Sequence, residues 1–174
     1  IILRPERLRA PEHWRKPRVV LAASRSDLFT PVVPVVFREE VFRTMALCPE
    51  HTFLVLTKRP EEMLAFCVSP YLRTLAHPQT WPLPNVWFGI SVWDQESADR
   101  DIPLLRLTKA AHRWVSYESA LARIAWRFPA SLGLDPAIEL VIMGCESGPG
   151  RRLPKCRVCA GQPHYCIRIP GAGG

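Results

Sequence analysis

Short apolar runs that end in polar clusters recur along the chain, and amphipathic stretches lie between them. Apolar runs of this length are typical of strands buried in a parallel sheet, whereas apolar positions three or four residues apart are typical of helices. The runs predict five strands, at residues 18–24, 52–57, 85–92, 113–116 and 138–143. The amphipathic stretches predict helices at about 35–47, 60–67 and 95–107, with shorter helical turns near 72–76 and within 120–130.

The alternation of strands and helices sets the fold class. Strands that are joined by helical crossovers must run parallel, so we expect an α/β fold of parallel β/α repeats. With about five strands in 174 residues, the chain is short for a complete eight-stranded barrel of about 250 residues. We therefore predict a partial, TIM-barrel-like sheet with no edge strand of another kind, and we expect Pro103 to distort or split its helix.

Composition divides the chain into three parts. Residues 1–17 are a basic, proline-rich lead-in, residues 18–152 form one partial barrel domain, and residues 153–174 are a cysteine-containing tail that we expect to be disordered. The formal charge of +7 favours an anionic ligand or nucleic acid as a partner. Because the Lys and Arg residues are scattered, the alternative is a protein that is merely basic. For the lead-in, two interpretations stay open: it is simply solvated, or it contacts phosphate groups.

Two features bear on the compartment. No apolar run approaches the roughly 20 residues of a membrane span, so we expect no membrane contact. Cys48 and Cys67 lie inside apolar segments and are predicted to be buried thiols, which favours a reducing, cytoplasmic setting.

Polar side chains follow every predicted strand, where the carboxyl ends of parallel strands share one edge. We expect a ligand or cofactor there, and Glu118 with Glu146 would form an acid/base pair whose pKa values differ. Alternatively, Asp27, Asp94 and Ser119 are helix N-caps, and Lys58 either pairs with a carboxylate or holds an anion. The predicted cofactor-binding residues are Ser26, Asp27, Lys58, Ser91, Asp94, Glu118, Glu146 and Ser147.

The tail carries a separate candidate site. Cys156 and Cys159 have the spacing of a metal-binding turn, and His164 and Cys166 follow. The four residues are a candidate zinc site, with free thiols in a disordered tail as the alternative.

Several motifs occur in a familiar order: LRPERL at 3–8, HWRKP at 13–17, SDLF at 26–29, LTKRP at 56–60, NVW at 85–87 with GISV at 89–92, ADR at 98–100 with IPLL at 102–105, Val115-Ser116 with Glu118, and ESGPG at 146–150. This series resembles the phage and bacterial family of unknown function that is named for phage gene products thirty-seven and sixty-eight. The resemblance covers about residues 3–152. It implies a TIM-barrel-like, radical-SAM-like protein with a three-cysteine motif, an iron–sulfur cluster and S-adenosylmethionine, whose ligand lies over Asp27, Lys58, Asp94, Glu118 and Glu146.

The chain also departs from that family. The family's cysteine motif precedes the position of Leu3, and the tail replaces the expected final strand after Arg152. An iron–sulfur cluster needs cysteine thiolates, so we expect that this chain does not assemble the cluster itself and is a truncated member. The alternatives are a nucleotide- or nucleic-acid-binding module and a non-functional gene fragment. An unclosed sheet also leaves exposed edges through which the chain could associate.

Overall fold

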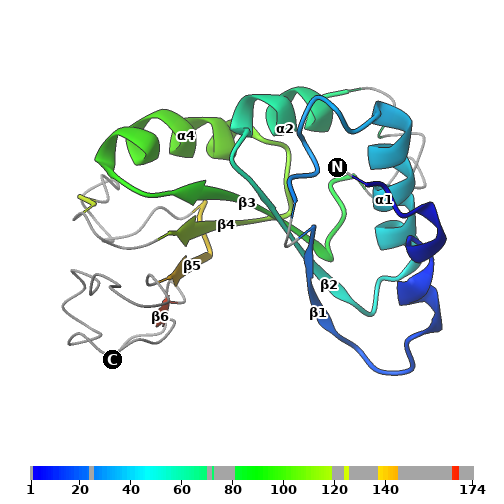
Figure 1. The fold of residues 1–174 in the computed structure, drawn as a ribbon. Coiled ribbons are helices and arrows are strands. Elements are labelled where there is room, and N and C mark those ends of the chain that lie inside the picture. Colours follow the sequence, from blue (N-terminus) through cyan, green and yellow to red (C-terminus); the bar gives the residue numbers. More distant parts are fainter. Residues whose placement is uncertain are drawn as a thin grey trace, which may run out of the picture.

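The computed structural model describes residues 2–23, 26–69, 72, 81–118, 124–125 and 137–144, together with the backbone of 166–168. Strands β1 (Val19–Ala22), β2 (Thr52–Thr57), β3 (Val86–Val92), β4 (His112–Tyr117) and β5 (Leu140–Met143) lie side by side in chain order and run parallel. The sheet curls into a half-barrel (Figure 1). The predicted α/β class and the partial TIM-barrel-like architecture are therefore confirmed.

Within the described ranges, three helices connect the strands and cover one face of the sheet (Figure 1): α1 (Val35–Leu47), α2 (Pro60–Cys67) and α4 (Gln95–Leu107). Pro60 occupies the first turn of α2 with Glu61 and Glu62 behind it, as the helix dipole favours. Pro103 does not split α4, which is a single helix. The packing of Ala98, Ile102 and Leu105 into the core holds α4 together across the missing N–H.

The aromatic core lies between these helices and the sheet. Phe42 of α1 stacks on Phe88 of β3 at 5.6 Å between ring centroids, and it contacts Phe66 of α2 at 5.1 Å. Since side chains alternate along a strand, Val86 and Ile90 share the helix face with Phe88, and all three are buried. The opposite, concave face carries Gly89 and Trp114, which are register partners.

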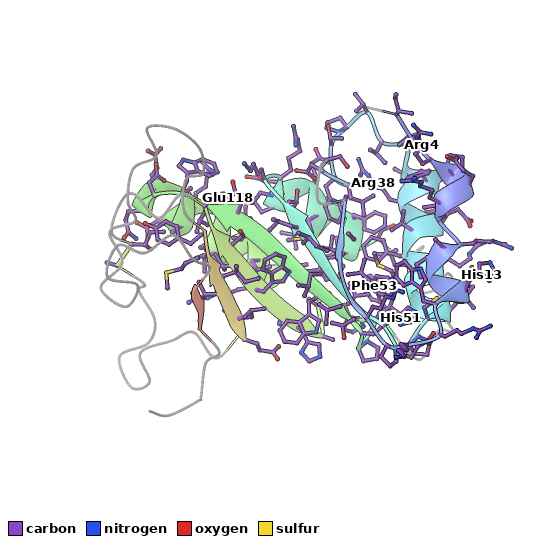
Figure 2. The ribbon with its side chains drawn as sticks, turned by 60° about the horizontal axis from the view of Figure 1, so that its bottom comes forward. Arg4, His13, Arg38, His51, Phe53 and Glu118 are labelled. Atoms are coloured by element: carbon purple, nitrogen blue, oxygen red, sulfur yellow. The ribbon has the colours of Figure 1, made fainter. Side chains whose placement is uncertain are left out.

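The N-terminal segment contains two short 3₁₀ helices, η1 (Pro5–Arg7) and η2 (Ala10–His13). Nε2 of the buried His51 donates a hydrogen bond to the carbonyl of Pro11 at 3.1 Å, and the His51 ring lies 5.4 Å from that of Trp14. Figure 2 shows His51 and Phe53 near the segment that carries His13, away from Glu118. The lead-in is thus attached to the domain at His51, the residue directly before β2.

Strand β6 (Cys166–Arg168) differs from the sequence-based expectation. It pairs antiparallel with β5, whereas we expected no edge strand of another kind. Three residues are too few for a periodic pattern to be recognised. Of the helical turn that we expected near 72–76 only Leu72 is described, and of the one within 120–130 only residues 124–125.

No helix in the described part of the chain combines the length and the apolar character that crossing a bilayer requires.

Candidate functional site

The carboxyl ends of β1 to β4 form the rim of a cavity of about 270 Å³. Parallel strands place these ends together, as the sequence predicted. Ser26 and Asp27 follow β1, Lys58 follows β2, Ser91 is the next-to-last residue of β3, and Glu118 follows β4. All five line the cavity, together with Ala23, Leu56, Thr57 and Arg59.

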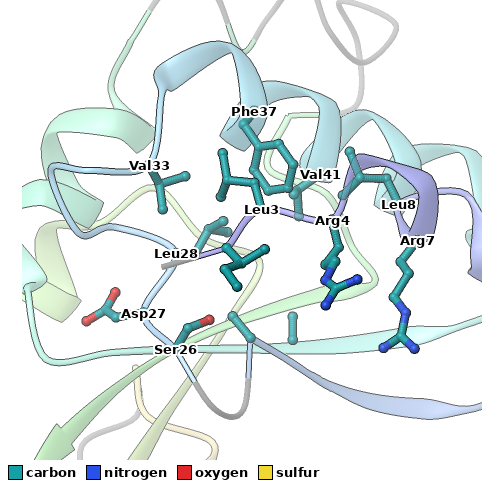
Figure 3. Close-up of a pocket in the computed structure, with 13 residues that line it drawn as sticks. Leu3, Arg4, Arg7, Leu8, Ser26, Asp27, Leu28, Val33, Phe37 and Val41 are labelled. Atoms are coloured by element: carbon teal, nitrogen blue, oxygen red, sulfur yellow. The ribbon is translucent and has the colours of Figure 1, made fainter.

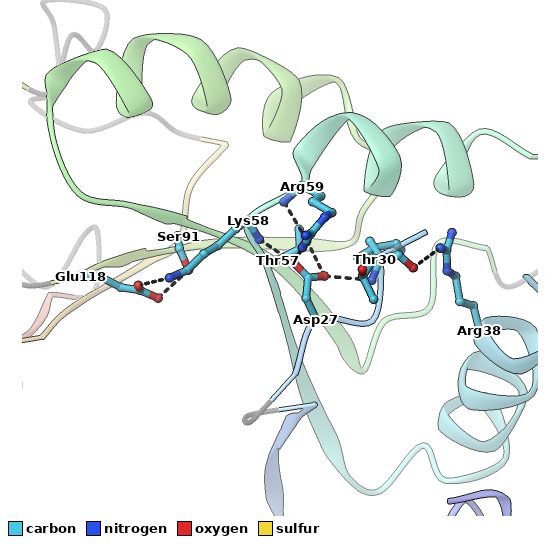
Figure 4. A network of polar contacts seen from close by, with 9 residues as sticks. Asp27, Thr30, Arg38, Thr57, Lys58, Arg59, Ser91 and Glu118 are labelled. Carbon is cyan, nitrogen blue, oxygen red and sulfur yellow. Dashed lines mark hydrogen bonds and ion pairs between the residues drawn. The ribbon is translucent and has the colours of Figure 1, made fainter. Parts of the chain in front are cut away.

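Asp27 is the most heavily bonded residue of the rim (Figure 4). Its carboxylate accepts hydrogen bonds from the Thr57 hydroxyl at 2.8 and 2.9 Å and from the Arg59 guanidinium at 3.0 Å. The backbone N–H groups of Phe29 and Lys58 also donate to it, at 2.9 and 3.0 Å. The side chain is 17% exposed. With its lone pairs used in this way, Asp27 joins the end of β1 to the end of β2 and has little capacity left for a ligand.

Asp27 is not a helix N-cap, contrary to one interpretation of the sequence. Helix α1 begins at Val35, well beyond it in the chain. The Asp27 carboxylate instead accepts the N–H of Phe29, an Asx-turn contact that competes with capping.

Glu118 and Lys58 form an ion pair over the end of β3. The Lys58 Nζ atom lies 2.7 Å from Oε2 of Glu118, and the Ser91 hydroxyl donates to Oε1 at 2.6 Å (Figure 4). Lys58 is 57% exposed and Glu118 35%. Solvent therefore reaches both charges, and a ligand can compete for either partner.

Asp94 is the N-cap of α4 and is absent from the residues that line the cavity. Its carboxylate accepts the Ser97 N–H at 2.8 Å, and the Ser97 hydroxyl accepts the Asp94 N–H in return, which makes a capping box. Hydrogen bonds from Ser97 lower the pKa of Asp94, and the bond from the backbone N–H has a larger effect than the one from the side chain. The N-cap interpretation of Asp94 is the one that the geometry supports.

The remaining predicted residues fall largely outside the described ranges. Glu146 and Ser147 both lie outside them, so the Glu118–Glu146 pair stays a prediction. The same holds for the zinc site, because Cys156, Cys159 and His164 are outside, and only the backbone of Cys166 is described.

Ala23 has a positive φ of 56° at the end of β1. Residues other than glycine adopt this left-handed conformation at a cost of roughly 1–2 kcal/mol. Its carbonyl accepts the Ser26 N–H at 2.9 Å, which closes a turn at the rim. The strained residue thus lies at the border of the cavity.

A second cavity of about 500 Å³ adjoins the first and shares Ala23, Ser26 and Asp27 with it. We call it the apolar cavity (Figure 3). It lies between the N-terminal segment, the end of β1 and helix α1, and its other lining residues are Ile2, Leu3, Arg4, Arg7, Leu8, Ala22, Leu28, Val33, Phe37 and Val41. Sequence reasoning missed this cavity, although the apolar Leu3 and Leu8 that flank the two arginines were a signal that the lead-in packs on the domain.

The described residues do not fit an iron–sulfur cluster. No group of three or more His, Cys, Asp or Glu side chains within the described ranges is arranged to hold a metal ion. The two cysteines whose side chains are described, Cys48 and Cys67, are buried, and burial raises the pKa of each thiol. Thiolates are the ligands that a cluster needs, so neither side chain is suited to that role.

Comparison with the curated proteins and with the solved structures found no match. A family model, by contrast, matches residues 1–157, which is most of the 174-residue chain. The resemblance to a family of unknown function is confirmed to that extent. With its half-barrel fold and its polar strand ends, the chain belongs to the family described as Protein of unknown function (DUF5131).

Proposed function

We propose that this chain binds S-adenosylmethionine at the carboxyl ends of β1 to β4, as the ligand-holding half of a radical-SAM-like site. The observation that carries the proposal is the solvent-accessible ion pair of Lys58 and Glu118 in the 270 Å³ cavity. The resemblance of the ordered motifs to a radical-SAM-like family names the ligand.

The ion pair suits the amino-acid end of this ligand, which carries an ammonium and a carboxylate. Glu118 would accept a hydrogen bond from the ligand's ammonium, and Lys58 would bind the ligand's carboxylate. An exposed ion pair contributes only about 0–1 kcal/mol, so exchanging one partner for a ligand group costs little. The hydroxyl of Ser91 holds one carboxylate oxygen of Glu118 in place while the other oxygen changes partner.

Asp27 has a supporting role in this proposal. Its bonds to Thr57 and to the Lys58 backbone fix the start of the loop that carries the Lys58 side chain. When bound, S-adenosylmethionine supplies an activated sulfonium. The proposal is limited to ligand binding, because the described residues do not fit an iron–sulfur cluster.

Isothermal titration calorimetry with S-adenosylmethionine tests the proposal. We expect Glu118→Gln and Lys58→Met each to weaken binding by about tenfold or more, as the loss of a charged hydrogen bond does. Glu62→Gln is the matched control, because Glu62 is exposed on α2 and does not line the cavity. Adenosine, which lacks both charged groups, should bind about tenfold more weakly than the full ligand and should be insensitive to Glu118→Gln. Wild-type protein that does not bind, or a Glu118→Gln variant of unchanged affinity, contradicts the proposal.

Nucleic-acid binding is the second candidate, and the exposed lead-in favours it. The lead-in cations Arg4, Arg7, Arg9, Arg15 and Lys16 are exposed, and so is Arg18, which directly follows the lead-in. The Arg18 guanidinium lies 4.7 Å from the centre of the Trp14 ring, an arrangement on which a base could also stack. Fluorescence anisotropy of a labelled oligonucleotide should then show affinity that falls steeply with salt and that Arg15→Ala with Lys16→Ala reduces. The absence of binding, or binding that is indifferent to salt, rules this candidate out.

A further inference from the structure

The apolar cavity has walls that suit an apolar ligand. Leu28 and Val33 are buried, and Leu3, Phe37 and Val41 are partly buried against the core. The volume of about 500 Å³ lies within the roughly 300–1,000 Å³ of small-molecule sites. Transfer of an apolar molecule from water into this cavity is therefore favourable.

Among the described residues that line it, Arg4 and Arg7 are the only cationic side chains. Figure 3 shows both guanidinium groups extending on the same side, from the segment around η1. Arg4 lies 3.6 Å from Glu6, and both side chains are largely exposed, so the pair is weak. Within the described part of the chain, the Arg7 side chain makes no ion pair.

Asp27 is the only acidic residue in the described part of the lining, and its charge is already compensated. The Arg59 guanidinium, two backbone N–H groups and the Thr57 hydroxyl all donate to its carboxylate. The cavity thus combines an apolar interior with a positive rim, in which Arg4 is paired only weakly, with the exposed Glu6. Charge complementarity selects an apolar molecule that ends in an anion.

We infer that the apolar cavity binds a small molecule with an apolar body and one carboxylate or phosphate, which Arg4 and Arg7 hold. Arginine presents paired N–H donors that match both anions. The far end of such a ligand lies at Ala23, Ser26 and Asp27, which the two cavities share. This ligand is the substrate if the proposed function holds, because its apolar end then lies next to the binding site of S-adenosylmethionine.

Calorimetry with octanoate, octyl phosphate and neutral 1-octanol tests the inference in the full chain, without S-adenosylmethionine. We expect both anions to bind more tightly than 1-octanol, and the stronger of the two identifies the preferred head group. The double variant Arg4→Ala, Arg7→Ala should lose about tenfold or more in affinity for the anions and little for 1-octanol. Arg9→Ala with Arg15→Ala is the matched control, because it removes the same charge from exposed positions outside the cavity and should change affinity by less than about twofold.

A second variant tests the cavity rather than the charge. Val41→Trp places a larger side chain in the cavity and should abolish anion binding, while its thermal unfolding shows that the fold persists. Anion binding that survives Val41→Trp, that is equal in the two double variants, or that is no stronger than binding of 1-octanol overturns the inference.

The two proposals fail separately. Glu118→Gln should leave octanoate binding unchanged, because Glu118 does not line the apolar cavity. Protein that binds S-adenosylmethionine but neither anion contradicts the apolar-anion site alone. Protein that binds an anion through Arg4 and Arg7 but not S-adenosylmethionine leaves the site in place and removes its role as a substrate pocket.

Discussion

The ammonium of Lys58 meets the carboxylate of Glu118 at 2.7 Å, although β3 separates the two strands that these residues follow. Neighbouring strands lie about 4.8 Å apart, so the long lysine side chain must reach across the end of β3. Ser91 at that end donates to the same carboxylate. Three successive strands thereby converge on one group of charges that solvent can reach.

Substitution of two carboxylates of the rim should lower the free energy of unfolding by different amounts. Asp27→Ala removes the acceptor of several hydrogen bonds around a mostly buried carboxylate, and we expect a loss of about 2 kcal/mol in the free energy of unfolding. Glu118→Gln should cost less than about 1 kcal/mol, since it affects an exposed ion pair. Urea denaturation measures both, and equal losses would contradict the assignment of Asp27 to the fold and Glu118 to the ligand.

Gly89 is required by the Trp114 indole. A Cβ atom at position 89 would lie 2.3 Å from ring atoms of Trp114, whose N–H donates to the Trp87 carbonyl at 3.2 Å. We expect Gly89→Ala to lower the free energy of unfolding by about 1–3 kcal/mol, the usual cost of overpacking. Gly144→Ala is the control, because its nearest neighbour, the Tyr117 carbonyl oxygen, would lie 3.9 Å from the new Cβ.

The size of Trp114 makes this prediction testable by rescue. Trp114→Phe in the Gly89→Ala background should recover part of the lost stability, because the smaller ring makes room for the methyl group. If urea denaturation shows strictly additive losses, the steric explanation is wrong.

Asn85 connects the start of β3 to the chain that leaves α1. Its side-chain amide donates to the carbonyls of Met45, Cys48 and His51, at 2.9, 3.0 and 3.2 Å. Asn85→Ala should cost about 1–3 kcal/mol, since it leaves partly buried acceptors without a donor. Asn85→Asp should cost more at neutral pH than Asn85→Ala does, because it points a negative charge at three carbonyl oxygens. Thermal unfolding of the two variants gives the order, and an Asp variant that is the more stable of the two would refute this role.

The α4 cap should depend on pH. Hydrogen bonds from Ser97 lower the pKa of Asp94 in the folded state, so its ionised form stabilises the fold above the ordinary carboxyl pKa of about 3.9. That contribution is lost as the pH falls through the lowered folded-state pKa. Asp94→Ala should therefore reduce the unfolding temperature at pH 7, and the difference from wild type should shrink below about pH 4. A difference that is constant from pH 7 to pH 2 would contradict the assignment.

Local patterns predicted the strands and the helices but not the partners across the sheet. The apolar runs located β1 to β5 because a buried strand needs only its own residues to be recognised. Asp27 and Asp94 look alike in sequence, since each follows a strand, yet only Asp94 caps a helix. The proline-containing stretch before Val35 delays α1, and Thr57 and Arg59, the partners of Asp27, lie some thirty residues away.

The apolar cavity could not be predicted from local sequence patterns, for a related reason. Its walls come from the lead-in, the end of β1 and α1, and the lead-in alone has the composition of a solvated basic arm. The contact of His51 with Pro11, which helps to hold that arm, spans forty residues of chain. Such a contact depends on the folded arrangement and leaves no periodic signal in the sequence.

The position of the ligand at the strand ends is measured most directly by a titration of ¹⁵N-labelled protein with S-adenosylmethionine, followed through assigned backbone amide signals. The largest shifts should occur at Lys58, Ser91 and Glu118, with smaller ones at Asp27. Unchanged spectra at saturating ligand, or shifts confined to residues 2–18, would contradict a binding site at the carboxyl ends of these strands.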